Sequence, residues 1–343
     1  MSSTTQVPDQ LPWDPNSTRF PSRKELPKIP GAPEGAAWVW GKDDWLGRLN
    51  LLTPARVKAA AQEIKSGEMF RLDLPLHIPE TPAFGREPFQ HNIKEIVDGI
   101  VFDDTYTLNT QSGTQWDGFR HFAHIESKTF YNNAKSTDIT STPTCNSIHH
   151  WANHGIASRA ILLDYYTHYT ETHSTPYDPY TTHAVTLADL TACARAQGID
   201  LRPESQGGDI KPGDILLVRT GFVVRYHQLT PQQRADVAAR SHENLTWAGL
   251  AQEEPLLDWL HDCYFAAVAG DSPTFEAWPP SQENGYIHQQ ILALWGMPLG
   301  EMWDLEALSK RCREVGRWVF FLTSAPANAL GGVGSHANAT AIL

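Results

Sequence analysis

Two short, wholly apolar runs constrain the fold of this chain more than any other feature of its sequence. Residues Ala160 to Leu163 end at Asp164, and Ile215 to Val218 lie within the segment GDILLVRTG. Runs of this kind are typical of strands that are covered on both faces. Since such strands need helices on both sides of their sheet, the two runs predict an α/β fold.

Helix signals alternate with further strand signals over most of the chain. Thr53 and Pro54 supply a helix cap and a first-turn proline, and Gly67 closes that unit. Further helices are predicted over residues 186–196, from 230 onwards and over 254–260, and further strands over 70–74, 263–268 and 318–322. There is no internal repeat, and no obvious linker lies between residues 45 and 325. One α/β domain over residues 36–343 is the simplest interpretation.

Residues 1–35 differ from the rest of the chain because they carry repeated prolines and few apolar runs. This composition favours an extended N-terminal arm. We expect irregular stretches at residues 75–105, 165–183 and 271–286. Long loops in compact domains are often functional.

Charge and composition exclude several classes of partner. The formal net charge is −12 at pH 7, whereas nucleic-acid binders concentrate Lys and Arg on one surface. The four cysteines lie far apart without a CxxC pair, so neither a zinc knuckle nor a redox pair is indicated. Residues 1–10 are polar, and no segment is apolar over about 18 residues. We therefore expect a cytoplasmic protein with no nucleic-acid or membrane partner.

Residues 111–121 read QSGTQWDGFRH, a dense polar cluster after a predicted strand. The segment resembles the HxGTHxDxPxH motif of the metal-dependent cyclase and cyclic-amide hydrolase superfamily, which includes kynurenine formamidases and isatin hydrolases. Gly113, Thr114, Asp117 and His121 match the motif. The blocks GRLNLLTPARV, ASRAILLDY, GDILLVRTGF, AGDSPTFE and GMPLGEMWDLEAL also resemble successive family blocks, so the resemblance spans roughly residues 40 to 335.

The resemblance implies the swivelling β/β/α architecture, with a central mixed, barrel-like sheet, and assembly as a homodimer or homotetramer. In the family, the motif residues, a distant histidine and a glutamate or glutamine hold one or two metal ions. Carried over by position, the ligands of this chain would be Asp117, His121, His288 and Glu301. The thirteen-residue gap between His288 and Glu301 gives no independent ligand signal.

The segment departs from the motif at three positions, and two of them change the expected metal content. Gln111 and Gln115 stand where the family has its two leading histidines, and Phe119 replaces the motif proline. A glutamine offers a neutral amide oxygen, which is a poor ligand for zinc but acceptable to harder ions. We therefore expect one divalent ion, manganese, zinc or magnesium, held by the four residues carried over.

The leading hypothesis is hydrolysis of a cyclic amide, lactone or related carbonyl compound by metal-activated water. Asp117, His121 and His288 would be catalytic, with either histidine as the general base. Gln111 and Gln115 would be weak ligands or substrate-binding residues. Trp116 would line an aromatic-walled pocket for a cyclic or aromatic small molecule, or would belong to the core.

Simpler interpretations stand beside these roles. Asp117 could end a turn, His288 could be an ordinary helix histidine, and Glu301 could be a solvated acid. A cyclase or dehydratase of secondary metabolism would use the same polarised carbonyl without net hydrolysis. The two glutamines also leave open a non-catalytic small-molecule binding protein with a degenerate metal site.

Overall fold

A mixed sheet of nine strands forms the centre of residues 10–280 and 285–343, which the computed structural model describes. The strand order is β1-β13-β11-β5-β7-β9-β10-β4-β12. The strands are β1 (Met69–Arg71), β4 (Gln115–Asp117), β5 (Ile156–Leu163), β7 (Ile215–Val218), β9 (Ala267–Gly270), β10 (Leu299–Glu301), β11 (Val319–Ser324), β12 (Gly334–Ser335) and β13 (Ala339–Ile342). Strands β5, β7, β9 and β10 run parallel, and the strands beyond them on either side pair antiparallel.

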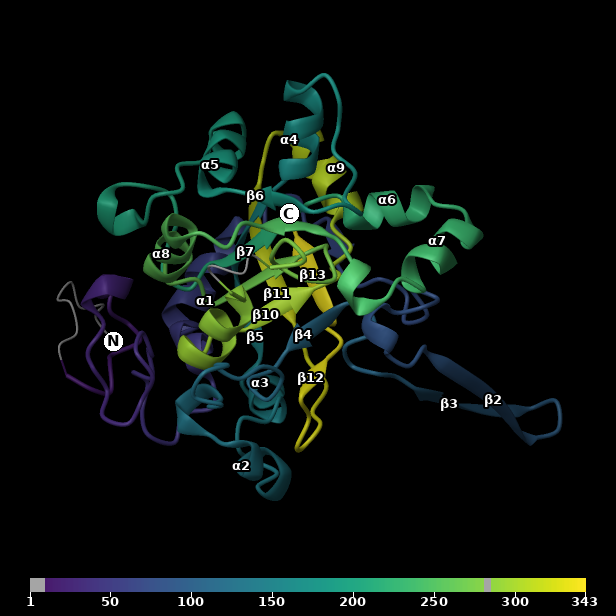
Figure 1. The fold of residues 1–343 in the computed structure, drawn as a ribbon, viewed down its shortest axis with the longest axis horizontal. Helices are drawn as coiled ribbons and strands as arrows, with labels where there is room; N and C mark the ends of the chain where they lie inside the picture. Colours follow the sequence, from purple (N-terminus) through teal and green to yellow (C-terminus); the bar gives the residue numbers. More distant parts are fainter. Residues whose placement is uncertain (1–9, 281–284) are drawn as a thin grey trace.

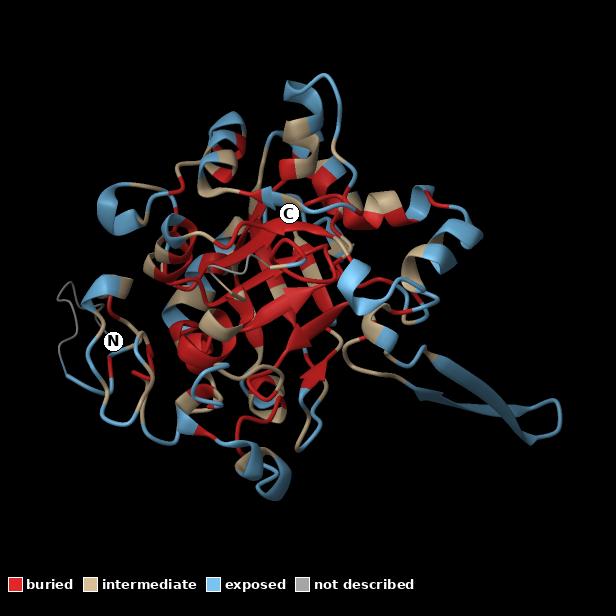
Figure 2. Ribbon diagram, viewed as in Figure 1, coloured by how far each residue is buried: buried red, intermediate tan, exposed pale blue. Residues whose placement is uncertain are grey.

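The two apolar runs lie in the middle of this sheet. β5 and β7 pair in parallel from Ala160 opposite Ile215 to Leu163 opposite Val218, and both runs are buried. Figure 2 shows the buried sheet at the centre, surrounded by helices whose outer surfaces are exposed. The predicted α/β fold with a central mixed sheet is confirmed.

Nine α-helices of the described residues surround the sheet (Figure 1). They are α1 (Pro54–Ala60), α2 (Ser136–Ser141), α3 (His149–His154), α4 (Tyr165–Thr172), α5 (Leu187–Ala196), α6 (Phe222–Gln228), α7 (Pro231–Ala238), α8 (Glu254–Asp262) and α9 (Glu306–Val315). Short 3-10 turns cover Arg23–Glu25, Gly47–Leu51, Ala61–Glu63, Ala83–Gly85, Tyr131–Asn133, Glu204–Gln206 and His242–Asn244, and a π-helix covers Gln289–Leu294. Strands β6 (His183–Val185) and β8 (Ala248–Leu250) form a small parallel sheet of their own. The predicted cap of α5 is confirmed, because the Thr186 side chain accepts a hydrogen bond from the Asp189 N–H group.

Two sequence expectations are wrong in detail. The strand expected over 263–268 begins only at Ala267, because Tyr264 has a φ of 50°, which belongs to a turn and not to a strand. Helix α4 occupies part of the stretch 165–183 that was expected to be irregular. The stretch 271–286 has no helix or strand among its described residues, and residues 281–284 lie outside them.

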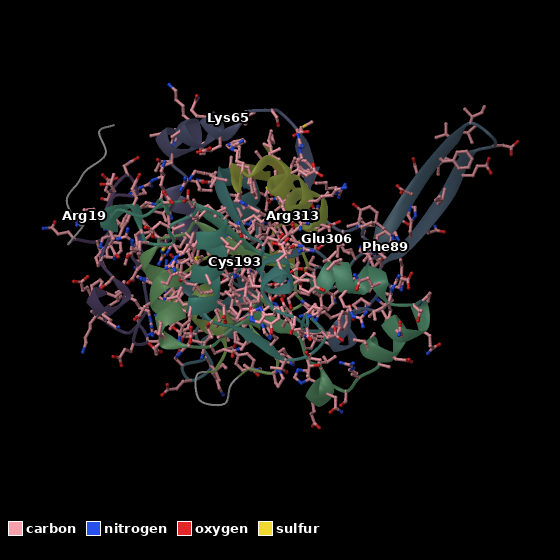
Figure 3. All side chains as sticks on the ribbon, turned by 90° about the horizontal axis from the view of Figure 1, so that it is seen from above. Arg19, Lys65, Phe89, Cys193, Glu306 and Arg313 are labelled. Carbon is pink, nitrogen blue, oxygen red and sulfur yellow. The ribbon has the colours of Figure 1, made fainter. Side chains whose placement is uncertain are left out.

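A long hairpin corrects the expectation for residues 75–105. Strands β2 (Gln90–Val97) and β3 (Val101–Thr107) pair antiparallel and project from the body of the molecule (Figures 1 and 3). Every residue of both strands is exposed, including Ile93, Phe102 and Tyr106 at 66%, 58% and 56%. Strand patterns are recognised by one apolar and one polar face, and a hairpin exposed on both faces lacks that alternation.

The described part of the N-terminal region, residues 10–35, packs on the body through a few anchors. Trp13 is buried in a cluster with Val39 and Tyr264. Arg23 forms ion pairs with two acids of α8. The boundary of the arm at residue 35 stays a prediction, and residues 1–9 lie outside the described residues.

The structure also bears on the cysteines and on membrane insertion. All four cysteines are buried free thiols, as expected for small core residues. Among the described helices, none combines the length and the apolar character that crossing a bilayer requires.

Candidate metal centre

The pairing of β4 with β10 brings distant polar residues to one face of the sheet. Glu301 lies opposite Gln115 and Leu299 lies opposite Asp117. Because side chains alternate along a strand, Gln115, Asp117 and Glu301 share one face, while Trp116 points to the other. His288 immediately precedes the π-helix and completes the group.

Three of the four predicted ligands converge at this place. The His288 Nε2 atom lies 3.0 Å from Glu301 Oε1 and 3.6 Å from Asp117 Oδ2. One ligand atom from each residue lies within 4.8 Å of the others, and all three residues are buried. The Asp117 Oδ2 atom is buried without a hydrogen-bond partner among the described residues. A carboxylate oxygen of this kind fits a bound cation, so the residues form a candidate metal site.

The fourth predicted ligand, His121, lies beside this group and not within it. Its Nε2 atom is 3.9 Å from Asp117 Oδ2, and 21% of its side chain is exposed. Burial lowers the pKa of His121, although the Asp117 charge opposes this effect. His121 is therefore neutral near pH 7 and can accept a proton.

Glu276 belongs to the centre although it was not among the predicted site residues. It is fully buried, and its Oε2 atom lies 2.7 Å from Nδ1 of His288. An acceptor at Nδ1 keeps the proton there and turns Nε2 towards Asp117 and Glu301, as carboxylates do for metal-binding histidines. The only signal in the sequence was an acid in the family-like block AGDSPTFE.

The two glutamines act within the centre as hydrogen-bond partners. The Gln115 amide nitrogen donates to Glu301 Oε2 and to Gln111 Oε1, both at 2.9 Å, and lies 3.2 Å from Asp117 Oδ1. An amide nitrogen carries no free electron pair for a metal ion, but the amide oxygen does. The Gln115 Oε1 atom is buried without a hydrogen-bond partner among the described residues, so the number of metal ions stays a prediction.

The charges of the centre also fit a cation. Burial and the Asp117 charge raise the pKa of Glu301 to about 7. Burial would lower the pKa of His288, but the Glu276 charge and the close contacts of the ring with its carboxylate neighbours raise it well above its ordinary value. Three buried carboxylates around one imidazole leave an excess of negative charge that a divalent ion would neutralise.

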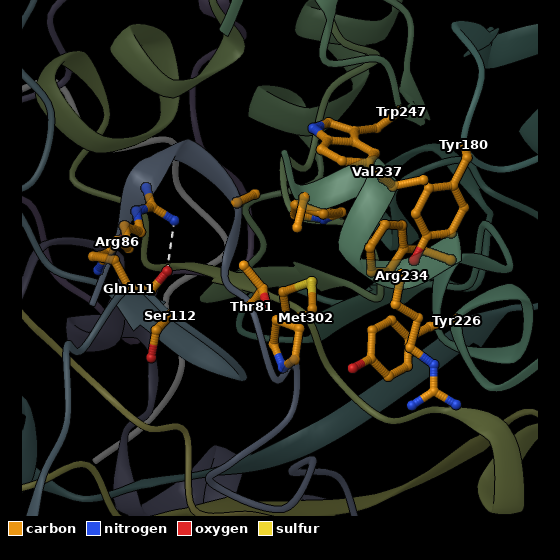
Figure 4. A pocket seen from close by; sticks show the side chains of 15 residues that line it. Thr81, Arg86, Gln111, Ser112, Tyr180, Tyr226, Arg234, Val237, Trp247 and Met302 are labelled. Carbon is orange, nitrogen blue, oxygen red and sulfur yellow. Dashed lines mark hydrogen bonds between the residues drawn. The ribbon is translucent and has the colours of Figure 1, made fainter. Parts of the chain in front are cut away.

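A cavity with aromatic walls (Figure 4) is linked to the centre by Gln111, which lines the cavity and accepts a hydrogen bond from Gln115. Tyr180, Phe222, Tyr226 and Trp247 line it, and Gln111 is among the residues on its side nearest the centre. None of the four aromatic residues was predicted, because only the tertiary fold brings them together.

Trp116 is a core residue and not a pocket wall. It is completely buried, and its Nε1–H group donates to Ser324 Oγ at 2.9 Å. Its ring packs edge to face on Trp303, with 4.9 Å between the centroids. The expectation that Trp116 contacts substrate is corrected, because strand alternation turns it away from Gln115 and Asp117.

Comparisons with known proteins identify the family. Residues 70–277 match the family described as putative cyclase. A crystal structure described as that of a novel cyclase is 28% identical, with a TM-score of 0.75 over 90% of this chain and 99% of that one. Isatin hydrolase A from Ralstonia solanacearum is 17% identical, with a TM-score of 0.54 over 84% of this chain and 97% of that one. Isatin hydrolase A from Labrenzia aggregata is 14% identical, with a TM-score of 0.52 over 80% and 93%.

No curated protein matches the sequence. The two isatin hydrolases show the fold alone, and together with the cyclase structure they confirm the predicted cyclase-like architecture. The family match covers more than half of the 343 residues. The protein therefore belongs to the putative cyclase family of enzymes.

Proposed function

We propose that the protein is a metal-dependent hydrolase that opens a cyclic amide, a lactone or a related carbonyl compound. The observation that carries this proposal is the convergence of Asp117, His288 and Glu301 in a buried group beside a cavity with aromatic walls. Water would add to the carbonyl carbon, and the bond from that carbon to the ring nitrogen or oxygen would break. A carboxylate and an amine or hydroxyl group would result.

The three converging residues would hold one divalent ion, manganese, zinc or magnesium, and His121 would lie beside that ion. Such an ion would supply a Lewis acid that polarises the carbonyl group and makes water more acidic. Glu276 would orient His288 through Nδ1, and Gln115 would hold one oxygen of Glu301 through its amide nitrogen.

His121 would serve as the general base. Its Nε2 atom would take a proton from the attacking water and return it to the leaving nitrogen or oxygen. Two observations support this role. The ring is neutral near pH 7 because burial lowers its pKa, and part of its side chain is open to a substrate.

A second candidate is cyclisation or dehydration at the same centre, which would use the polarised carbonyl without net addition of water. The similarity to the structure described as a novel cyclase favours it. A product with one water fewer than its substrate would identify this reaction by mass spectrometry.

The partners of the protein are part of the proposal. We expect a cyclic or aromatic small molecule, no nucleic acid or membrane, a cytoplasmic location and a homodimer or homotetramer. The exposed apolar residues of the β2–β3 hairpin support a second copy as its partner, since isolated hairpins are marginally stable in water.

Metal content and turnover test the proposal together. The purified protein should contain about one manganese, zinc or magnesium ion per chain and should hydrolyse some members of a panel of lactones, cyclic imides and formamides. Asp117→Asn should lose both properties, and His288→Ala should lose the metal. Asp98→Asn, in the exposed turn of the hairpin, is the matched control and should keep both. A metal-free protein after reconstitution, or full turnover in Asp117→Asn, would disprove the proposed centre.

A further inference from the structure

The charge of the cavity differs from the charge of the whole chain. The chain carries a formal net charge of −12, yet the described residues that line the cavity include Arg86 and Arg234 and no Asp, Glu or His. The polar groups on its walls include the Tyr180 and Tyr226 hydroxyls and the two guanidinium groups. Such a lining favours a ligand that combines a ring with an anionic group.

Arg86 is held in place at the side of the cavity nearest the centre. Its Nη1–H group donates to the Gln111 carbonyl at 2.6 Å, and its guanidinium lies 5.1 Å from the centroid of the Phe84 ring. A guanidinium has five N–H donors, so this anchoring leaves others for a ligand. The Gln111 Oε1 atom accepts a hydrogen bond from the Gln115 amide nitrogen, which also donates to Glu301 in the centre.

Through Gln111, Arg86 connects the aromatic walls of the cavity with the residues proposed to react. A group next to the scissile carbonyl would therefore be placed beside Arg86.

Arg234 lies on the other side of the cavity and is more fully engaged (Figure 4). It stacks on Tyr226 at 4.6 Å, donates from Nε to the Leu229 carbonyl and lies 3.8 Å from a Glu80 oxygen. Its charge is therefore partly balanced by the protein itself. This difference makes Arg86 the stronger candidate for binding an anion.

We infer that the cavity selects ring compounds that carry a carboxylate or similar anionic group near the reacting carbonyl, and that Arg86 binds this group. The reacting carbonyl in this inference rests on the proposed function, whereas the binding of an anionic ring compound by Arg86 does not. The ring would lie against Phe222 and Trp247, while the anion would accept hydrogen bonds from the Arg86 guanidinium. Charge-assisted pairs of this kind are stronger than neutral ones.

Calorimetric titration of the purified protein with benzoate and with benzamide tests the inference, because the two probes share size and ring and differ in charge. Benzoate should bind about ten times more tightly than benzamide or better, and Arg86→Gln should remove this preference. Arg311→Gln, on helix α9 and outside the lining of the cavity, is the matched control and should keep it. Thermal unfolding should confirm that both variants are folded.

Equal affinity for the two probes, an unchanged preference in Arg86→Gln, or no binding of either probe would overturn the inference. Failure of the proposed function would look different. A protein that binds benzoate through Arg86 but holds no metal and hydrolyses nothing would contradict only the hydrolase. A metal-dependent hydrolase with no preference for anionic rings would contradict only the role of Arg86.

Discussion

Replacing Glu276 should weaken metal binding without unfolding the protein. The carboxylate lies 2.7 Å from His288 Nδ1, and both residues are buried. Glu276→Gln keeps the size of the side chain and an oxygen that can accept from Nδ1, but it removes the charge. Glu276→Ala removes the acceptor as well, so that the imidazole can turn away from Asp117 and Glu301.

The expected magnitude follows from this geometry. Partners behind a metal-binding histidine typically contribute about tenfold to hundredfold in metal affinity. We expect roughly tenfold weaker binding for Glu276→Gln and up to about hundredfold for Glu276→Ala, which corresponds to about 1.4 and 2.7 kcal/mol.

Competition with a fluorescent chelator measures these affinities for zinc or manganese. The exposed substitution Glu243→Gln is the control, and thermal unfolding separates loss of metal affinity from loss of fold. Wild-type metal affinity in a folded Glu276→Ala protein would refute the argument that this carboxylate positions His288.

Three further predictions concern the base, the acid stability and the hairpin. His121→Gln should lower kcat by about a hundredfold or more while metal content stays near one ion per chain, and a small change in kcat would exclude His121 as the base. Burial lowers the pKa of His261 from 6.5 to about 4. As the pH falls from about 6.5 to about 4, His261 is protonated in the unfolded chain but stays neutral in the folded protein, so the free energy of unfolding decreases. The loss is about 3 kcal/mol. Urea unfolding of His261→Gln should show less of it than the wild type, and an equal loss would contradict the assignment. The double substitution Ile93→Ser and Phe102→Ser should reduce the mass found by light scattering to that of a monomer at nearly unchanged melting temperature, whereas an unchanged mass would exclude the hairpin as the contact between copies.

Local features of the sequence determined much of the fold. The runs in β5 and β7 are apolar throughout, and Thr186 and Thr230 cap helices at the expected places. Both signals depend only on residues that are close together in the sequence, so a short stretch of sequence is enough to recognise the strand or the helix cap. The motif around Asp117 and the later blocks also indicated the family through their order along the chain.

Only the tertiary structure decided how the site is built. Gln115 and Glu301 are 186 residues apart, and the register of β4 on β10 alone makes them neighbours. The same register turns Trp116 into the core. Glu276 reaches His288 from a stretch with no regular element, and Arg86 enters the cavity from the segment before the hairpin. Strand register and loop paths depend on packing between distant segments, which no local pattern in the sequence records.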